Sequence, residues 1–135
     1  MEKELQRKYL QLQLFKQQLN AMAEEKAMID ERMSELFITI DAISKLGKIK
    51  QGEEIWSSLG SGAFVRSGIK DTENVLVSIG AGVVVSETKE KTMEILKSRV
   101  DELMKIDSDM VAEINKLSKE VYELESEIQQ LAEKK

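Results

Sequence analysis

The 135-residue chain contains no cysteine, no histidine and no proline, and only 4% of its residues are aromatic. Without cysteine it can form no disulfide and no thiolate metal site, and nucleophile systems that need histidine or cysteine are excluded as well. One third of the residues are charged, which favours long solvated helices over a compact core, and helices without proline can run uninterrupted. We therefore expect a helical protein that is not an enzyme and that binds no metal or cofactor.

Charge and hydropathy restrict the partners in a similar way. Acidic and basic residues are interleaved, with a net charge of −5, so the basic face typical of nucleic-acid binding is not predicted. No apolar run approaches the roughly 20 residues of a membrane span, and the N-terminus lacks the apolar block of a signal peptide. We expect a cytoplasmic protein with one domain over residues 1–135, which binds neither nucleic acid nor membrane.

Apolar residues recur with alternating spacings of three and four in two long segments, residues 2–46 and 88–134. Ten of twelve a and d positions are apolar in the first segment, and eleven of twelve in the second. This pattern predicts two helices, each about 65–70 Å long, that pair as a coiled coil because neither can bury its stripe alone. The first set of positions is Leu5, Lys8, Leu12, Phe15, Leu19, Met22, Lys26, Ile29, Met33, Leu36, Ile40 and Ile43. The second set is Met93, Leu96, Val100, Leu103, Asp107, Met110, Ile114, Leu117, Val121, Leu124, Ile128 and Leu131.

The register of the two helices follows from these positions. In an antiparallel pair, each residue of the first set faces one residue of the second set, and the two together form a layer. All twelve layers are filled when the numbers of the facing residues sum to 136. A slip of one heptad strands apolar side chains, each losing about 1.5–3 kcal/mol of burial. The same register places Lys26 and Asp107 in adjacent layers and predicts an ion pair that pins the register at some cost in stability. Lys8, opposite Ile128 near the helix ends, is expected to keep its ammonium in water.

The segment between the helices, residues 47–87, contains all seven glycines. Two copies of Gly-x-Gly followed by three apolar residues, Gly60–Val65 and Gly80–Val85, lie 20 residues apart and predict two similar β-hairpins. Neither copy is a dinucleotide-binding fingerprint, because valine stands where the third glycine would be. Thr88 is the expected N-cap of the second helix. The four short strands are expected at Ile55–Leu59, Ala63–Ile69, Val75–Ile79 and Val83–Val85.

A long helix, two β-hairpins and a second long helix resemble the alpha class of archaeal prefoldin subunits, and the residues that carry the match are Gly60–Val65 and Val75–Val83. The resemblance implies an α+β fold whose hairpins join a double β-barrel platform of two alpha and four beta-class subunits. It also implies an ATP-independent holdase, which captures unfolded proteins at its coiled-coil tips and delivers them to a group II chaperonin. The alternative is a structural subunit like the gamma-type prefoldins, whose edge strands pair repeatedly into filaments.

The a and d positions at which the two helices meet form a seam. Apolar residues outside this seam indicate where unfolded proteins, the clients of such a chaperone, would bind. Tyr9, Leu10 and Leu14 cluster near the start of the first helix, where a two-helix coil would not bury them. Scattered surface hydrophobes are the alternative reading, because they are common. Fraying of the helix ends would add nearby seam residues. The predicted client-binding residues are Leu5, Tyr9, Leu10, Leu12, Leu14, Phe15, Leu124, Ile128 and Leu131.

The other end of the helices should serve assembly, because a two-hairpin unit has open strand edges and little core of its own. Phe37, Ile38 and Ile95 are expected to pack the helix bases under the β platform, and Trp56 is expected to anchor the platform or a subunit interface. The predicted oligomer-interface residues are Ala63, Phe64, Val65, Ile69, Val75, Val77, Ile79, Val83, Val84 and Val85.

Overall fold

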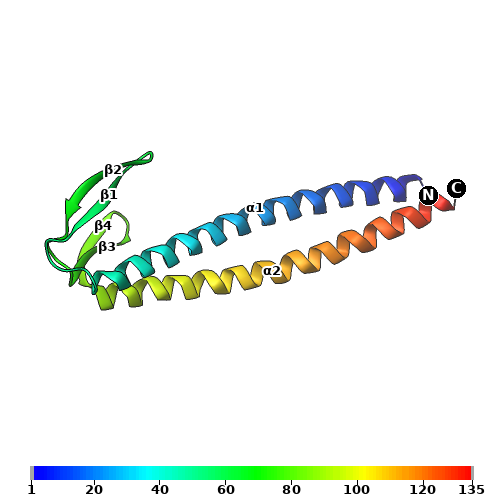
Figure 1. Ribbon diagram of the computed structural model, residues 1–135. Coiled ribbons are helices and arrows are strands. Elements are labelled where there is room, and N and C mark those ends of the chain that lie inside the picture. The colour runs from blue at the N-terminus through cyan, green and yellow to red at the C-terminus, as the bar shows by residue number, and fades with distance from the viewer. Residues whose placement is uncertain (1, 135) are drawn as a thin grey trace. The chain divides into compact units, whose positions relative to one another are not determined.

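The computed structural model describes residues 2–134. Its elements are α1 (Glu2–Leu46), β1 (Glu54–Gly60), β2 (Ala63–Gly68), β3 (Asn74–Gly80), β4 (Val83–Thr88) and α2 (Lys89–Glu133), shown in Figure 1. The predicted α+β architecture, two long helices with two β-hairpins between them, is confirmed. The described residues form two compact units: unit 1 comprises residues 2–33 and 102–134, and unit 2 comprises Ser34–Asp101.

Unit 1 is an antiparallel pair of helices joined by the predicted seam. In its part of α1, every side chain that is not exposed belongs to the predicted a and d positions. Near the helix ends, Leu12, Val121, Leu124 and Ile128 form a buried cluster. These residues come from neighbouring layers of the predicted register, in which Leu12 faces Leu124. The seam therefore buries the apolar stripe of each helix against that of the other, which neither helix could do alone.

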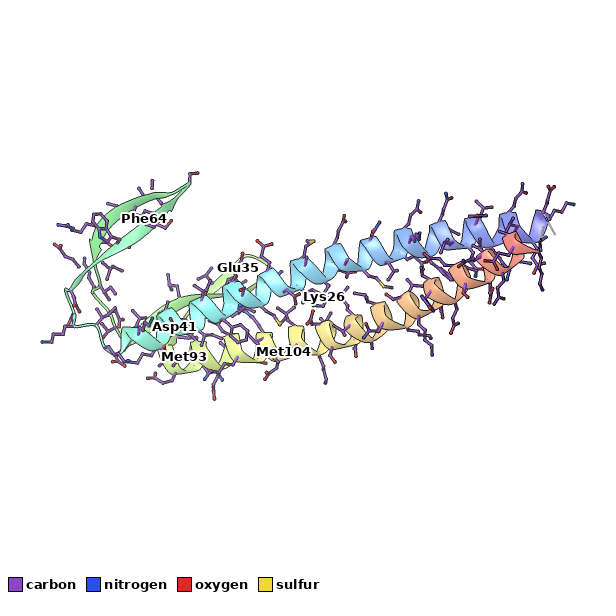
Figure 2. The ribbon with its side chains drawn as sticks, turned by 45° about the vertical axis from the view of Figure 1, so that its right-hand side comes forward. Lys26, Glu35, Asp41, Phe64, Met93 and Met104 are labelled. Atoms are coloured by element: carbon purple, nitrogen blue, oxygen red, sulfur yellow. The ribbon has the colours of Figure 1, made fainter. Side chains whose placement is uncertain are left out.

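The polar layer in the middle of the seam also has the predicted contact. The Nζ atom of Lys26 lies 3.3 Å from Oδ1 of Asp107 on α2 and 2.7 Å from Oδ2 of Asp30 on α1. Figure 2 labels Lys26 on α1. Asp107 Oδ1 is buried and has no hydrogen-bond partner among the described residues, so the lysine charge offsets its burial. The hydrogen bond with Asp30 raises the pKa of Lys26 and lowers the pKa of Asp30. The predicted Lys26–Asp107 contact is therefore confirmed.

Lys8, the second lysine of the seam, also has a carboxylate partner. Its ammonium forms an ion pair and hydrogen bond with Glu127 Oε2 on α2, and only 22% of its side chain is exposed. The contact is exposed, and the carboxylate partner is the feature that the sequence did not predict. Glu127 adjoins Ile128, the residue that faces Lys8 in the predicted register, and the long lysine side chain can reach this neighbouring position.

The two hairpins of unit 2 are built alike. In hairpin 1 (β1–β2), Glu54 pairs with Gly68, and in hairpin 2 (β3–β4), Asn74 pairs with Thr88; each pair along the two ladders differs by 20 residues from its counterpart. Both turns have two central residues with positive φ, and the second turn has φ of 52° at Ala81 and 76° at Gly82. Such angles are typical of the type I′ turns that match the twist of a hairpin. The internal repeat in the sequence thus corresponds to two equivalent hairpins.

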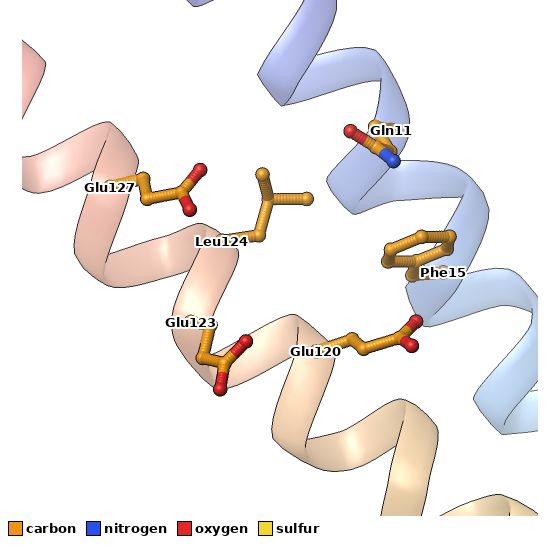
Figure 3. A pocket seen from close by; sticks show the side chains of 6 residues that line it. All are labelled: Gln11, Phe15, Glu120, Glu123, Leu124 and Glu127. Atoms are coloured by element: carbon orange, nitrogen blue, oxygen red, sulfur yellow. The ribbon is translucent and has the colours of Figure 1, made fainter.

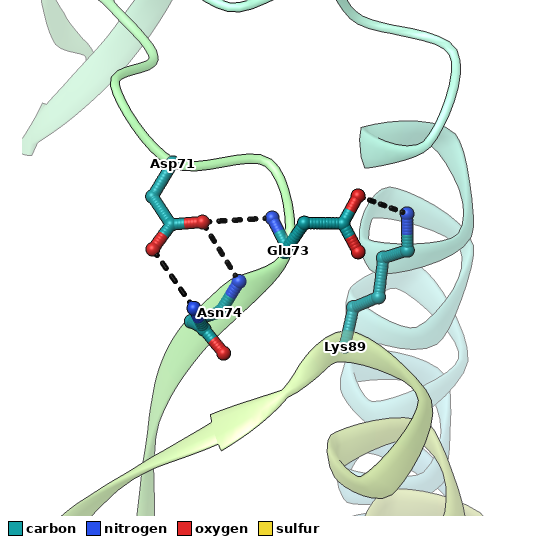
Figure 4. A network of polar contacts seen from close by, with 4 residues as sticks. All are labelled: Asp71, Glu73, Asn74 and Lys89. Carbon is teal, nitrogen blue, oxygen red and sulfur yellow. Dashed lines mark hydrogen bonds and ion pairs between the residues drawn. The ribbon is translucent and has the colours of Figure 1, made fainter.

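The loop before hairpin 2 is ordered by a network of polar contacts (Figure 4). Asp71 accepts hydrogen bonds from the backbone N–H groups of Glu73 and Asn74 and from the Asn74 side chain. These bonds, the one from Glu73 first, lower the pKa of Asp71. The backbone N–H of Lys89 donates to the Glu73 carbonyl at 2.8 Å, and the Lys89 ammonium lies 3.4 Å from the Glu73 carboxylate. The loop is thereby attached to the first residue of α2.

The start of α2 carries the expected N-cap. The hydroxyl of Thr88 accepts a hydrogen bond from the backbone N–H of Lys91 at 3.1 Å, which satisfies one of the free donors of the first turn. Thr92 donates its hydroxyl to the Thr88 carbonyl at 2.8 Å and is almost fully buried. The cap and this second bond fix the transition from strand β4 to helix α2.

Hairpin 2 is also held further along α2, where Arg99 Nη2 donates to the Ser78 carbonyl. Val77, on the adjacent position of β3, is buried in unit 2. Ile95 is half-buried, as expected of the helix base. Phe37 and Ile38 remain more than half exposed in the single chain, and their packing under the β platform of an assembly stays a prediction.

Candidate binding surfaces

The predicted off-seam cluster in unit 1 is exposed. Tyr9, Leu10 and Leu14 have 51%, 62% and 59% of their surface accessible. Tyr9 and Leu10 line a shallow hollow of about 420 Å³ together with Gln6 and Gln13. Lys16 is the one charged residue between positions 9 and 23. Residues 9–15 of α1 therefore present an uncharged surface of apolar and amide side chains, which can cover apolar groups without desolvating a charge.

The other predicted client-binding residues lie in the seam and are less accessible. Leu12, Leu124 and Ile128 are buried, whereas Leu5, Phe15 and Leu131 are half-buried. The six seam residues thus pack the helices against each other. They would become fully available to a partner only if the helix ends separated.

A groove between the helices of unit 1 was missed by sequence reasoning. Its volume is about 340 Å³, and Phe15 of α1 and Leu124 of α2 contribute apolar side chains to it (Figure 3). The remaining lining residues are Gln11, Glu120, Glu123 and Glu127. A signal was present in the sequence, since residues 120–133 contain five glutamates and no basic residue. A heptad analysis disregards it because these glutamates lie outside the a and d positions.

The hairpins of unit 2 expose apolar side chains. Leu76, at 75% accessible, and Trp56 and Phe64, at 64% and 60%, are more exposed than the seam residues of unit 1. The Arg66 guanidinium lies 5.1 Å from the centroid of the Trp56 ring and 3.5 Å from the Glu54 carboxylate. These contacts orient the tryptophan on the surface of hairpin 1.

The predicted oligomer-interface residues fall into three groups. Val77 is buried within unit 2, and its side chain is not accessible to a partner. Three further residues, Ile69, Val75 and Val85, are half-buried. The exposed group is Ala63, Phe64, Val65, Ile79, Val83 and Val84.

Each hairpin is a separate two-stranded sheet, β1 with β2 and β3 with β4. Every strand therefore has one edge without a neighbouring strand in the described chain. Open edges combined with exposed apolar residues favour pairing with another chain. An isolated hairpin is also marginally stable, so such pairing would stabilise the hairpins.

Residues 2–134 offer little for other kinds of site. Within this range, no group of three or more acidic, histidine or cysteine side chains is arranged to hold a metal ion. Neither α1 nor α2 combines the length and the apolar character that a membrane-crossing helix needs. The surfaces of the described chain that merit a functional interpretation are therefore those of the coil and the hairpins.

Comparison with known proteins shows which family shares these features. The family model "Prefoldin subunit" matches residues 15–134. The prefoldin subunit alpha of Methanococcus vannielii is 32% identical over 132 residues, which cover 98% of this chain and 88% of that protein. The prefoldin subunit alpha of Thermoplasma acidophilum is 36% identical over 75 residues, which cover 56% of this chain and 57% of that protein.

Two solved structures share the fold. A cryo-EM structure of filamentous PFD from Methanocaldococcus jannaschii matches with a TM-score of 0.75 at 17% identity, covering 86% of this chain and 96% of that chain. The crystal structure of the prefoldin beta subunit from Thermococcus strain KS-1 matches with a TM-score of 0.62 at 18% identity, covering 95% and 91%. At these identities the likeness concerns the fold.

Proposed function

Since the chain belongs to the prefoldin family and is a chaperone-type subunit, we propose that it is the alpha-class subunit of an ATP-independent holdase. In this proposal, unit 1 captures unfolded proteins and unit 2 joins the chain to beta-class subunits. Two alpha and four beta subunits form the assembly, in the cytoplasm, with the hairpins in a β-barrel platform. The captured protein is then delivered to a group II chaperonin.

The observation that carries the proposal is the exposed cluster of Tyr9, Leu10 and Leu14 within residues 9–15 of α1, which contain no charged side chain. These residues are not needed to close the seam, because the a and d residues already pack the two helices. An unfolded protein exposes apolar side chains, and covering them against this cluster removes apolar surface of both partners from water. Such binding needs no nucleotide and no covalent step, in keeping with a chain that lacks histidine and cysteine.

The test is a variant that combines Tyr9→Ser, Leu10→Ser and Leu14→Ser. Each side chain would contribute about 1.5–3 kcal/mol if a client covered it fully, so losing all three should weaken client binding by about tenfold or more. The measurement is suppression of aggregation of a denatured client by the chain assembled with a beta-class subunit.

A matched control carries Met28→Ser, Met104→Ser and Tyr122→Ser, three residues of unit 1 that are also more than half exposed but lie outside the cluster. This control should protect the client as well as the parent does. If instead the cluster variant protects as well as the parent, client capture lies elsewhere on the chain.

A second candidate function is a structural subunit that assembles into filaments. It is favoured by the open strand edges of both hairpins and by the fold shared with the filamentous PFD structure. Light scattering of the chain alone, and then mixed with a beta-class subunit, separates the two candidates. A filament gives scattering that grows with the concentration of the chain alone, whereas a closed assembly reaches a fixed mass once the beta subunit is present.

A further inference from the structure

The groove of unit 1 combines two chemical characters that the exposed cluster of α1 lacks. The half-buried Phe15 and the small exposed part of Leu124 supply apolar surface, and Glu120, Glu123 and Glu127 of α2 supply carboxylates around it (Figure 3). The volume of about 340 Å³ is near the lower limit of the roughly 300–1,000 Å³ of small-molecule pockets. It therefore suits one large side chain and its immediate neighbour rather than a folded partner.

The negative charge of the groove is only partly compensated by the chain itself. Lys8 pairs with Glu127, and Lys16 pairs with Glu125 just outside the groove. Within residues 2–134, the carboxylates of Glu120 and Glu123 form no ion pair and no hydrogen bond. These two carboxylates are therefore available to a cation supplied by a bound partner.

We propose that this groove selects which unfolded segments bind: those in which an aromatic or long aliphatic side chain neighbours a lysine or arginine. The proposal rests on the proposed function, because it names the class of client segment that unit 1 captures. The apolar side chain lies against Phe15 and Leu124, and the neighbouring cation approaches Glu120 and Glu123. A segment with acidic neighbours is repelled by the same two carboxylates, so the groove discriminates by charge as well as by apolar content.

The test uses three labelled unfolded peptides with one shared aromatic and aliphatic core, flanked by lysine, by glutamine or by glutamate. Binding to the full chain, assembled with a beta-class subunit, is followed by fluorescence anisotropy. We expect the lysine-flanked peptide to bind most tightly and the glutamate-flanked peptide most weakly. The difference should shrink as salt is added, because exposed charges are screened.

The variant that carries Glu120→Gln and Glu123→Gln should lower the affinity for the lysine-flanked peptide by about three- to tenfold, given the modest strength of exposed ion pairs. Its affinity for the glutamine-flanked peptide should not change. The matched control carries Glu24→Gln and Glu25→Gln, which remove the same charge from exposed residues of α1 outside the groove. This control should keep the preference for lysine, and helix content measured by circular dichroism should be the same in all variants.

Two results overturn the charge selection while leaving the proposed function intact. In one, the parent chain binds the three peptides equally, while the variant with serine at Tyr9, Leu10 and Leu14 no longer binds them. The other is an equal loss of lysine preference in the Glu24 and Glu25 control, which would assign the effect to total charge. If the parent binds none of the peptides, and does not protect a denatured client, the proposed function fails together with the selection.

Discussion

Units 1 and 2 differ in how completely they bury their own apolar side chains. In unit 1, the a and d residues of two helices face each other, and the seam is buried or half-buried along its length. In unit 2, each hairpin is a two-stranded sheet, and Trp56, Phe64 and Leu76 remain more than half exposed. A single hairpin has too few neighbours to cover both of its faces.

This difference separates two kinds of exposed apolar surface. The residues left outside the seam of unit 1, such as Tyr9 and Leu10, are not required for packing, so they can be covered and released without a change in the fold. The apolar residues of the hairpins belong to sheets with open edges, which gain stability from permanent pairing. We therefore assign transient binding to unit 1 and stable assembly to unit 2.

The largest expected effect comes from placing a charge on each face of hairpin 2. Val77 is 7% exposed and Val84 is 56% exposed. Val77→Asp buries a carboxylate without a partner, which should destabilise the chain by on the order of 3 kcal/mol or more. Val84→Asp should leave the fold of the chain nearly intact but reduce the mass of its assembly with a beta-class subunit. Circular dichroism melts and native mass spectrometry measure the two effects.

The two variants control each other, because they introduce the same charge on the same hairpin. An unchanged assembly mass for Val84→Asp would contradict the assignment of assembly to unit 2. An unchanged melting temperature for Val77→Asp would contradict the burial of this residue within the chain.

A smaller effect is expected in the polar layer of unit 1. Lys26→Leu leaves the buried Oδ1 of Asp107 without its nearest cation, and this variant should be destabilised. Asp107→Leu adds an apolar side chain opposite Ile29 and should be tolerated better. In the double variant the cost of the first change should largely disappear, because the uncompensated carboxylate is gone. Strict additivity of the unfolding free energies would show that the two side chains do not interact.

The smallest effect concerns acid stability and compares one carboxylate from each unit. The pKa of Asp71 is lowered chiefly by the hydrogen bond from the Glu73 N–H, and that of Asp30 chiefly by the hydrogen bond from Lys26. The ionised carboxylates of Asp71 and Asp30 therefore stabilise the folded chain above their ordinary pKa of 3.8. This stabilisation is lost as the pH falls through the lower pKa that each group has in the folded chain. Asp71→Asn and Asp30→Asn should therefore lose less stability than the parent on acidification, as melts at decreasing pH would show. Equal acid sensitivity of all three chains would contradict these shifts.

The helices, the hairpins and the Lys26–Asp107 contact could be predicted because each depends on a periodic pattern. A spacing of three and four places residues on one helix face, and the seam then determines which residues meet across the two helices. The repeat at 20 residues likewise predicts two hairpins with equivalent registers. Such patterns need only the sequence positions, since helix and strand geometry supplies the rest.

The features that could not be predicted depend on side chains outside these patterns. The bond from Arg99 to the Ser78 carbonyl links hairpin 2 to α2, and no spacing rule relates a helix residue to a strand carbonyl. Lys8 likewise reached Glu127 because a long side chain can leave its own layer. The groove was missed for a related reason: its carboxylates flank the seam without being part of it.

The central claim, that unit 1 captures clients and unit 2 assembles, is tested most directly by deleting residues 2–15 together with residues 121–135. The two deletions remove facing layers, because 15 and 121 sum to 136, so neither helix keeps an unpaired apolar stripe. The shortened chain, mixed with a beta-class subunit, is examined by native mass spectrometry and by suppression of client aggregation. We predict an assembly with the same stoichiometry as the parent and no protection of the client. Protection equal to that of the parent, or loss of the assembly, would contradict the claim.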